Sequence, residues 1–345
     1  MTVRTLVLAG SFLAACGGDD GVHHLADAPL VGNWATTSSL PVSRTHAVAL
    51  APGNGFIYLV DGYTDDAACN VGRADGRVFR AQRNSDGTLG AWTEGAAGTG
   101  GFVRSIPGGA TANGFLYVGG GAKNAPSWDG AIWFAKPDAG GDIATWTQAT
   151  NTLPAGEVVG SGPAVGIAGG RLYVGGGFKL GGSVVHMFTS TLDASTGQPG
   201  TFTKIADVPE VTSNIQVVGS ADHVYFVAGG GHVYVASLDG ATWTPTENIP
   251  GTAQFPNVEI AGDRLYAIPG VAPGGGAADV YTTTITSGGM LAPWTKLNTA
   301  PALLALGDQG VVTDGTYYAI GYDECYASGD AAAVAAEKVT YYLPL

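Results

Sequence analysis

Positively charged residues are scarce in this chain. Its 345 residues include 15 lysines and arginines against 28 aspartates and glutamates, which gives a formal net charge of -13. A chain this acidic repels phosphate backbones and anionic lipid, and it has too few basic residues to form a cationic patch. The composition therefore argues against nucleic acid as a partner, and the acidity itself serves simple solubility.

Long apolar runs are also missing. The one clear run, Leu6–Ala15, follows Arg4 at the start of the chain and is too short to span a bilayer. Its length and the charge before it are typical of a signal peptide. We therefore predict that residues 1–15 are a signal peptide and that no later segment crosses the membrane.

Glycine, by contrast, is abundant, with 56 residues. It follows no Gly-X-Y period and lies among β-branched and aromatic runs, a composition typical of many short strands and tight turns. One such run, Arg171-Leu-Tyr-Val-Gly-Gly-Gly177, recurs in six variants. Their shared tyrosines, at intervals of 41 to 59 residues, are Tyr58, Tyr117, Tyr173, Tyr225, Tyr266 and Tyr318. That interval is typical of a four-stranded blade repeated round a propeller.

Tryptophan supplies a second register with the same period. Its members are Trp34, Trp92, Trp146, Trp243 and Trp294, with Phe202 in the remaining place. Two registers at one period are hard to obtain by chance. We therefore predict an all-β fold, a six-bladed β-propeller formed by residues 32–345 as one domain.

The sixth blade is incomplete at the C-terminus. Its first three strands are expected at Gly310–Thr313, Thr316–Ile320 and Lys338–Leu343, after which the chain stops. The segment Gly32–Thr36 carries the unassigned Trp34 near the beginning of the chain. We predict that this N-terminal segment is the outer strand of blade six and pairs with the C-terminal strand, since closing the ring removes two exposed sheet edges.

The repeat resembles that of the kelch family of propellers. It combines a hydrophobic strand ending in paired glycines, an aromatic residue in the next strand and then a tryptophan. Ser85–Trp92 and Ser287–Trp294 are similar to the turn of bacterial kelch-like repeats, and Leu40–Arg44 fits the segment before the innermost strand. The paired glycines become degenerate in blades four to six.

A second resemblance concerns the cellular address. Leu13-Ala-Ala-Cys16 resembles the lipobox of bacterial lipoproteins. The resemblance implies that Cys16 is lipidated and becomes the N-terminus, which anchors the chain to a membrane without crossing it. Gly17 in place of an aspartate implies the outer membrane or the cell surface of the bacterial envelope. Residues 16–31 are then expected to form a flexible tether.

Cysteine is nearly absent from the rest of the chain. Only Cys69 and Cys325 remain, each shortly after the second strand of its blade, in blades one and six. Ring closure makes these blades neighbours, and an exported location permits a disulfide between them. Free thiols or a metal-binding pair are the alternatives.

The long connections of a propeller gather on one face, where binding residues collect. Nine residues on or near this face are candidates for ligand binding: Arg44, His46, Tyr63, Asp65, Arg104, Trp128, Asp129, Tyr322 and Asp323. Trp128 beside Asp129 suggests a stacking platform for a sugar or peptide, with an indole folded over the blade edge as the other interpretation. Asp65, Asp66, Asp323 and Glu324 could hold calcium, but solvated acidic loops are commoner, and we expect no metal and no cofactor.

Signals for catalysis are weak. The chain contains no G-x-S-x-G, H-E-x-x-H or P-loop spacing. Gln216, Glu259 and Asp308 fall in or near the inner strands of blades four to six, and they form no concentrated cluster in the sequence. We predict a monomeric, surface-anchored lipoprotein that binds a protein or glycan partner through its long loops. The alternative is a carbohydrate-active enzyme, of epimerase or lyase type, at the channel mouth.

Overall fold

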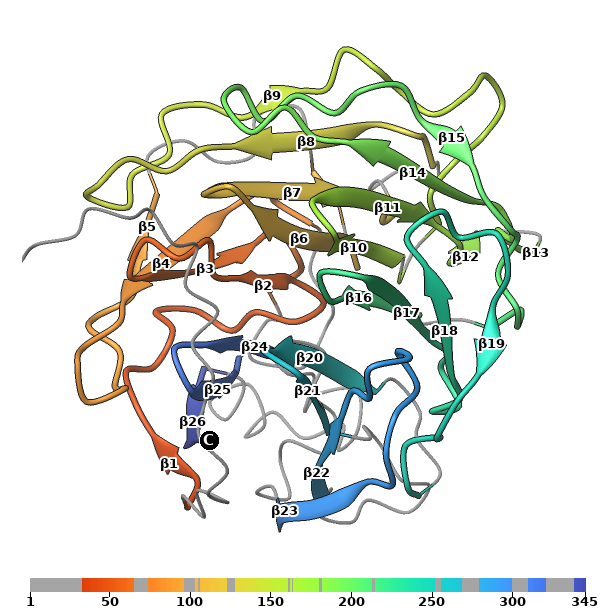
Figure 1. Ribbon diagram of the computed structural model, residues 1–345. Helices are drawn as coiled ribbons and strands as arrows, with labels where there is room; N and C mark the ends of the chain where they lie inside the picture. Colours follow the sequence, from red (N-terminus) through yellow and green to blue (C-terminus); the bar gives the residue numbers. More distant parts are fainter. Residues whose placement is uncertain are drawn as a thin grey trace, which may run out of the picture.

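The computed structural model describes residues 33–64, 74–95, 103–104, 106–122, 128–160, 162, 164–179, 182–212, 215–251, 256–268, 279–299, 310–320 and 338–345. They form six four-stranded antiparallel sheets, arranged as blades around a central channel (Figure 1). Within these ranges the chain forms strands and turns, and none of it is a helix able to cross a membrane. The predicted six-bladed β-propeller is confirmed.

Each blade has an innermost strand a and an outermost strand d. From a to d, blade one consists of β2 (Val48–Leu50), β3 (Phe56–Val60), β4 (Val78–Gln82) and β5 (Thr93–Glu94). Blade two consists of β6 (Gly108–Ala112), β7 (Phe115–Gly119), β8 (Ile132–Ala135) and β9 (Thr147–Gln148). Blade three consists of β10 (Ala164–Ala168), β11 (Arg171–Gly175), β14 (Met187–Thr191) and β15 (Thr203–Lys204). A two-stranded hairpin of β12 (Phe178–Lys179) and β13 (Gly182–Ser183) lies between strands b and c of blade three.

The remaining blades follow the same order. Blades four and five are β16 (Gln216–Gly219), β17 (His223–Val227), β18 (Val233–Ser237) and β19 (Thr244–Pro245), then β20 (Asn257–Ala261), β21 (Arg264–Ile268), β22 (Asp279–Thr284) and β23 (Thr295–Thr299). Blade six is β24 (Gly310–Thr313), β25 (Thr316–Ala319), β26 (Tyr341–Pro344) and β1 (Ala35–Thr36).

Blade six is built from both ends of the chain. Ala35 pairs with Tyr342 and Thr36 with Tyr341, so β1 is the outer neighbour of β26. Beyond β1, the backbone of Thr37 donates to Thr340 at 2.9 Å and that of Leu40 to Lys338 at 2.7 Å. The indole of Trp34 packs with its edge against Tyr317, 6.1 Å between ring centroids. The predicted closure by the N-terminal strand is therefore confirmed.

The repeated tyrosines join neighbouring blades. All six lie on strand b and are buried, and five of them donate the hydroxyl hydrogen to a carbonyl in the c–d turn of the next blade. The pairs are Tyr58 with Gly141, Tyr117 with Gly197, Tyr173 with Leu238, Tyr225 with Gly289 and Tyr318 with Gly87. Tyr266 precedes blade six, whose strands c and d come from opposite chain ends and share no turn. The repeated tyrosine thus marks a contact between neighbouring blades rather than a contact within one blade.

The tryptophan register has a similar role on the outer strands. The indole Nε1 of Trp92 donates to the Ser38 carbonyl at 3.0 Å, and that of Trp294 donates to the Glu247 carbonyl at 3.1 Å. In both cases the acceptor belongs to the segment that leaves the preceding blade. These two indoles therefore tie blades one and five to the blades before them.

The inner strand of blade one, β2, is short. The mostly apolar segment Thr45–Ala51 has the composition of a longer strand, whereas β2 spans only Val48–Leu50. His46 has φ of 53°, a left-handed conformation that interrupts the strand. Thr45 still forms an isolated bridge with Tyr63.

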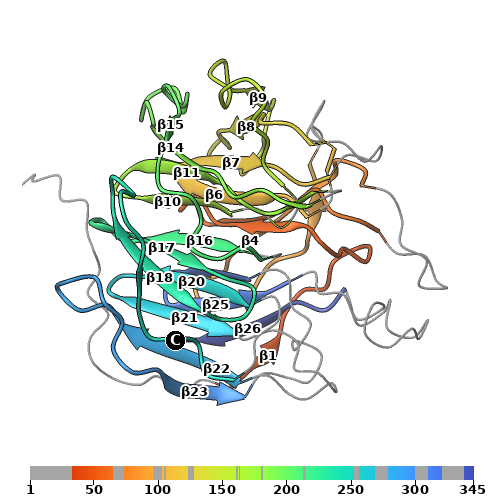
Figure 2. The same ribbon diagram turned by 90° about the vertical axis from the view of Figure 1, so that its right-hand side faces the viewer.

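The two faces of the disc differ. Connections from b to c and from d to a open on one side, which we call the b–c face, and the a–b and c–d turns open on the other. Figure 2 views the disc from its edge, with the c–d turn between β22 and β23 projecting to the left, away from the b–c face. Trp92, Phe79 and Tyr318 belong to one of the buried clusters that fill the space between adjacent blades.

Candidate functional site

Arg44 is buried on the b–c face of blade one and is bound to a carboxylate. Its two terminal nitrogens donate to the carboxylate of Asp75 at 2.9 and 2.7 Å. The same groups donate to Thr64 Oγ1 and to the Asp61 carbonyl, both at 2.8 Å. This two-pronged pairing fixes the chain on both sides of the b–c connection of blade one.

Arg104 forms the corresponding pair at blade two. Its Nη2 donates to both carboxylate oxygens of Asp129, at 2.9 and 2.7 Å, and the arginine itself is almost fully buried. Its backbone N–H donates to the Asp61 carboxylate at 2.5 Å. Asp61 therefore links both arginine sites, accepting at its carbonyl from Arg44 and at its side chain from Arg104.

Asp61 occupies an unusual environment for a carboxylate. It is fully buried at the end of β3, with φ of 61°. Burial raises the pKa of Asp61 to about 8, partly offset by the backbone N–H of Arg104 and by the charge of Arg44. Sequence analysis missed Asp61 and Asp75, because no spacing rule connects them to either arginine.

His46 and Tyr63 lie beside this network. Their rings meet edge to face with centroids 5.5 Å apart. The backbones of Thr45 and Tyr63 exchange hydrogen bonds of 3.2 and 2.8 Å, and Ile106 N–H donates to the His46 carbonyl at 3.0 Å. The structure thus brings Arg44, His46, Tyr63 and Arg104 together where blades one and two meet.

The other candidates are placed only in part. Trp128 and Asp129 are half-buried on the b–c face of blade two. Cys16, Asp65, Cys69, Tyr322, Asp323 and Cys325 lie outside the described residues, as do Asp66, Asp308, Glu324 and the segments predicted as signal peptide (1–15) and tether (16–31). Their roles stay predictions, as does ligand binding by the residues that the structure places.

Two histidine–glutamate pairs recur on the same face. His186 and His232 each stand immediately before strand c, in blades three and four. His186 Nδ1 lies 2.8 Å from Glu157, and His232 Nδ1 lies 2.7 Å from Glu210. Both glutamates belong to d–a connections, so each pair joins the start of strand c to the segment that leads into the same blade.

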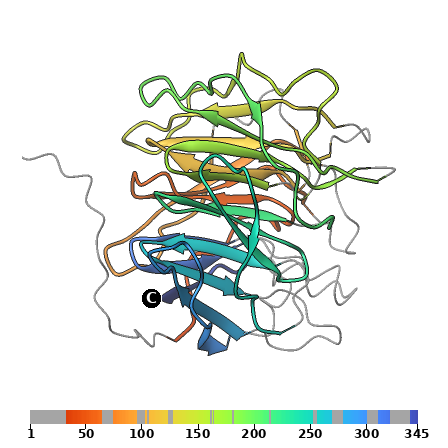
Figure 3. The same ribbon diagram turned by 45° about the vertical axis from the view of Figure 1, so that its right-hand side comes forward.

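Exposed apolar side chains also mark the b–c face. Of the large apolar side chains that the structure describes, three are exposed, namely Phe178, Val211 and Met290. Phe178 lies on the β12–β13 hairpin, which projects from the disc on the right of Figure 3, and Val211 lies in the d–a connection after β15. Met290 lies in the c–d turn between β22 and β23, on the opposite face.

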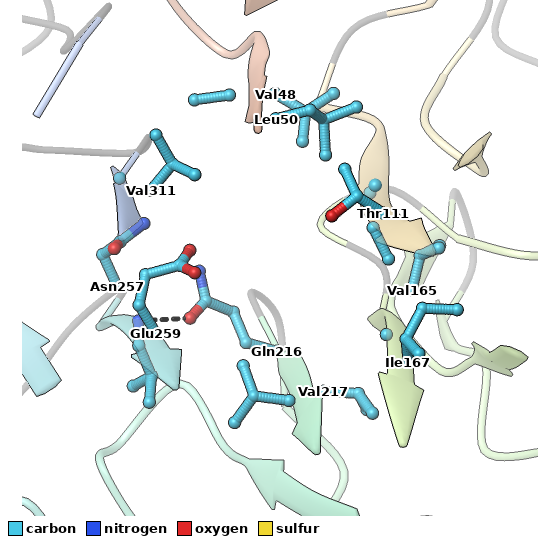
Figure 4. A pocket seen from close by; sticks show the side chains of 18 of the residues that line it. Val48, Leu50, Thr111, Val165, Ile167, Gln216, Val217, Asn257, Glu259 and Val311 are labelled. Carbon is cyan, nitrogen blue, oxygen red and sulfur yellow. Dashed lines mark hydrogen bonds between the residues drawn. The ribbon is translucent and has the colours of Figure 1, made fainter. Parts of the chain in front are cut away.

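A cavity of about 270 Å³ runs along the propeller axis. The inner strands of all six blades line it, and most of the side chains drawn in Figure 4 are apolar, among them Val48, Val165 and Val311. Polar side chains concentrate on the side formed by β16 and β20. Gln216 and Glu259 lie next to each other there (Figure 4), with Asn257 nearby.

Hydrogen bonds between blades fix this polar side. The backbone N–H of Val258 donates to Gln216 Oε1 at 2.6 Å. Tyr317 donates its hydroxyl hydrogen to Asn257 Oδ1. Burial raises the pKa of Glu259 to about 8, an effect that a hydrogen bond from the Val312 backbone N–H reduces. Burial, reinforced by the charge of Glu259, also raises the pKa of Tyr317.

Metal binding finds no support in the described part of the chain, where no three histidine, cysteine, aspartate or glutamate side chains gather as possible ligands. The calcium alternative rested on acidic loops outside those ranges. The site residues that remain are the arginine–aspartate network, the exposed apolar residues and the channel cluster.

Comparisons with known proteins add a likeness of shape. No family model matches the chain, and no curated protein sequence matches it. A solved structure described as "Structure of YjhT" superposes with a TM-score of 0.59, covering 88% of this chain and 95% of that chain at 16% sequence identity. The likeness shows the fold.

Proposed function

We propose that this chain is a lipid-anchored protein of the bacterial cell envelope, with a kelch-like propeller that binds a protein or glycan partner on the b–c face. The observation that carries the proposal is the contrast between the two faces. The b–c face combines two exposed apolar side chains, Phe178 and Val211, with loop ends held by ion pairs of the buried Arg44 and Arg104. The opposite face carries the a–b and c–d turns, with Met290 as its one exposed large apolar side chain among the described residues. Long loops on a rigid frame are where binding residues collect.

Both classes of partner have a suitable surface. Exposed Phe178 and Val211 are the kind of apolar side chains that become buried when a protein docks. Tyr63, His46 and Trp128 supply half-buried aromatic rings on this face, which suit stacking on a sugar. The tests of binding therefore include both a protein arm and a glycan arm.

A carbohydrate-active enzyme at the channel mouth is the weaker alternative. Such an enzyme needs acidic and basic groups that converge on one point and are free to exchange protons with a bound substrate. Arg44 and Arg104 instead direct their guanidinium groups to Asp75 and Asp129. These contacts suit arginines that hold the ends of the b–c connections in place, which favours binding over catalysis.

The partner experiment compares the two faces directly. A glycan array and a cross-linking pull-down are performed with the wild-type chain and with the variants Phe178→Ser, Val211→Ser and Trp128→Ala. Met290→Ser, which removes an exposed apolar side chain from the opposite face, is the matched control. We expect the b–c variants to weaken capture while the control retains it. Equal loss in Met290→Ser, or full retention in all three b–c variants, contradicts the proposal.

The anchor has its own test. Radiolabelled palmitate should be incorporated into the wild-type chain and not into Cys16→Ala. We expect the variant to leave the membrane fraction on cell breakage. Labelling that persists in Cys16→Ala would show that the lipobox resemblance has no chemical counterpart, without affecting the binding proposal.

A further inference from the structure

The channel wall consists of sheet edges. Strands β2, β6, β10, β16, β20 and β24 are each terminal in their sheets, so one side of every inner strand has no neighbouring strand. Backbone donors and acceptors on such an edge need other partners. Gln216 accepts from Val258 and Glu259 from Val312, each reaching across to the next blade. These two side chains therefore cover backbone donors of neighbouring inner strands.

Glu259 differs from Gln216 because it carries an ionisable group into the cavity. It retains some exposed surface toward the channel although protein surrounds it. No lysine or arginine among the described residues forms an ion pair with it, and no cationic side chain contributes to its pKa. A carboxyl group so placed either keeps a proton or takes a cation from solution.

The rest of the cavity indicates what kind of cation fits. A single carboxylate is too few oxygen ligands for a tightly held metal ion, which takes six or more from several side chains. The walls across the channel are apolar, formed by residues such as Leu50, Val165 and Ile167. An anion or a fully hydroxylated sugar would meet a carboxyl group at one end and hydrocarbon at the other.

We propose that the channel cavity binds a small organic ammonium ion, with the ammonium group held by Glu259 and the apolar body packed against the aliphatic side chains of blades one and three. An ammonium group has three donors for the carboxylate and for nearby backbone carbonyls on the strand edges. The cavity of about 270 Å³ accommodates a short alkyl or aryl chain. The net charge of -13 favours the approach of cations to the channel.

Binding of this kind has a proton signature. Because burial holds the pKa of Glu259 near 8, the carboxyl group is largely protonated at pH 7. A bound ammonium stabilises the carboxylate and so displaces the proton. Tyr317, the other titratable group close to Glu259, stays protonated throughout because its pKa is raised.

The experiment uses titration calorimetry of the full chain with hexylammonium chloride, and with 1-hexanol as the uncharged analogue. Titrations at pH 7 are repeated in phosphate and in HEPES, whose ionisation enthalpies differ and neither of which is a primary ammonium ion, so that proton release is measured. Glu259→Gln keeps an acceptor for Val312. Glu247→Gln, the same substitution at an exposed position, is the matched control.

We expect hexylammonium to bind the wild-type chain and the Glu247→Gln control alike, with release of a fraction of a proton. The Glu259→Gln variant should bind at least tenfold more weakly, and 1-hexanol should bind more weakly than the ammonium. Absence of binding, equal binding by Glu259→Gln, or equal binding of the alcohol overturns the proposal. Circular dichroism of each variant verifies that the propeller remains folded.

Discussion

The hydroxyl of Tyr318 in blade six donates a hydrogen bond of 2.6 Å to the carbonyl of Gly87 in blade one. The two residues are 231 positions apart in the chain, and the bond repeats across the ring closure the contact that four other tyrosines make between consecutive blades. The closure is therefore held by the same kind of contact as the rest of the ring.

Tyr318→Phe should lower the free energy of unfolding by about 1 kcal/mol, because a buried carbonyl loses its donor. Tyr225→Phe, which removes the same contact to Gly289 within the ring, should cost a similar amount. Tyr266→Phe should cost less, since no c–d turn of blade six lies opposite it. Urea unfolding curves measure all three, and an unchanged midpoint for Tyr318→Phe contradicts this account.

The stability of the chain should fall as the pH rises from about 4.5 to about 8. The unfolded chain ionises Glu259 near its ordinary pKa, whereas burial holds the folded pKa near 8, so the folded state binds the extra proton in that interval. Glu259→Gln should become more stable relative to the wild type across the interval, by up to about 5 kcal/mol at about 1.4 kcal/mol per pKa unit.

The pH dependence of stability should not vanish in Glu259→Gln, because burial raises the pKa of Asp61 as well. Denaturant unfolding at pH 5, 7 and 9 measures both the slope and its reduction. A constant difference between the variant and the wild type at all three values would show that Glu259 ionises normally in the folded state.

Asp129→Ala should destabilise the propeller by about 3 kcal/mol, since it leaves the buried guanidinium of Arg104 without its carboxylate. The double variant Arg104→Met with Asp129→Ala should recover part of that loss, because no uncompensated charge remains. A double-mutant cycle by thermal unfolding supplies the coupling energy. Strict additivity of the two changes would show that the pair is not coupled.

Gly166→Ala should destabilise by about 1 to 3 kcal/mol through overpacking of the inner ring. A Cβ at Gly166 would overlap the Val217 carbonyl of the adjacent inner strand, so β10 and β16 approach backbone to backbone. Gly288→Ala, whose Cβ would meet no atom within 4 Å, is the control and should be near neutral. Similar melting temperatures for the two variants would contradict this packing.

The disulfide between Cys69 and Cys325 stays a prediction that mass spectrometry can test. Both cysteines lie outside the described residues. We expect alkylation of the native, unreduced protein to leave both thiols unmodified, and a bridged peptide to appear after digestion. In the chain-entropy account, so long a loop contributes on the order of 5 kcal/mol, which reduction should remove.

The blades could be predicted because their signals are periodic. Tyr117 and Tyr173 occupy the same position in successive blades. Trp34, the tryptophan left without a blade of its own at the start of the chain, identified the strand that completes blade six. The reason for the repeat, a hydroxyl that reaches the next blade's turn, was not visible in the sequence, because spacing along the chain gives the period of a contact and not its partner.

The sequence predicted some residues of the candidate site but not the contacts between them. Arg44 and Arg104 were recognised, but their carboxylate partners follow from how two connections fold back over one face, which no local pattern encodes. The polar cluster of the cavity, formed by Gln216, Asn257, Glu259 and Tyr317, was also predicted only in part. Gln216 and Glu259 were expected near inner strands, whereas Asn257 and Tyr317 were not singled out. The left-handed conformation of His46 likewise shortened a strand that its composition favoured.

Construction of blade six from both chain ends has a mechanical consequence. The pairing of β1 with β26 involves only two residue pairs, supplemented by the bonds of Thr37 and Leu40. Tension applied to the N-terminal segment enters the propeller at this strand before any other. Under load, the outermost strand of blade six should peel first, exposing the edge of β26 while the other five blades remain intact.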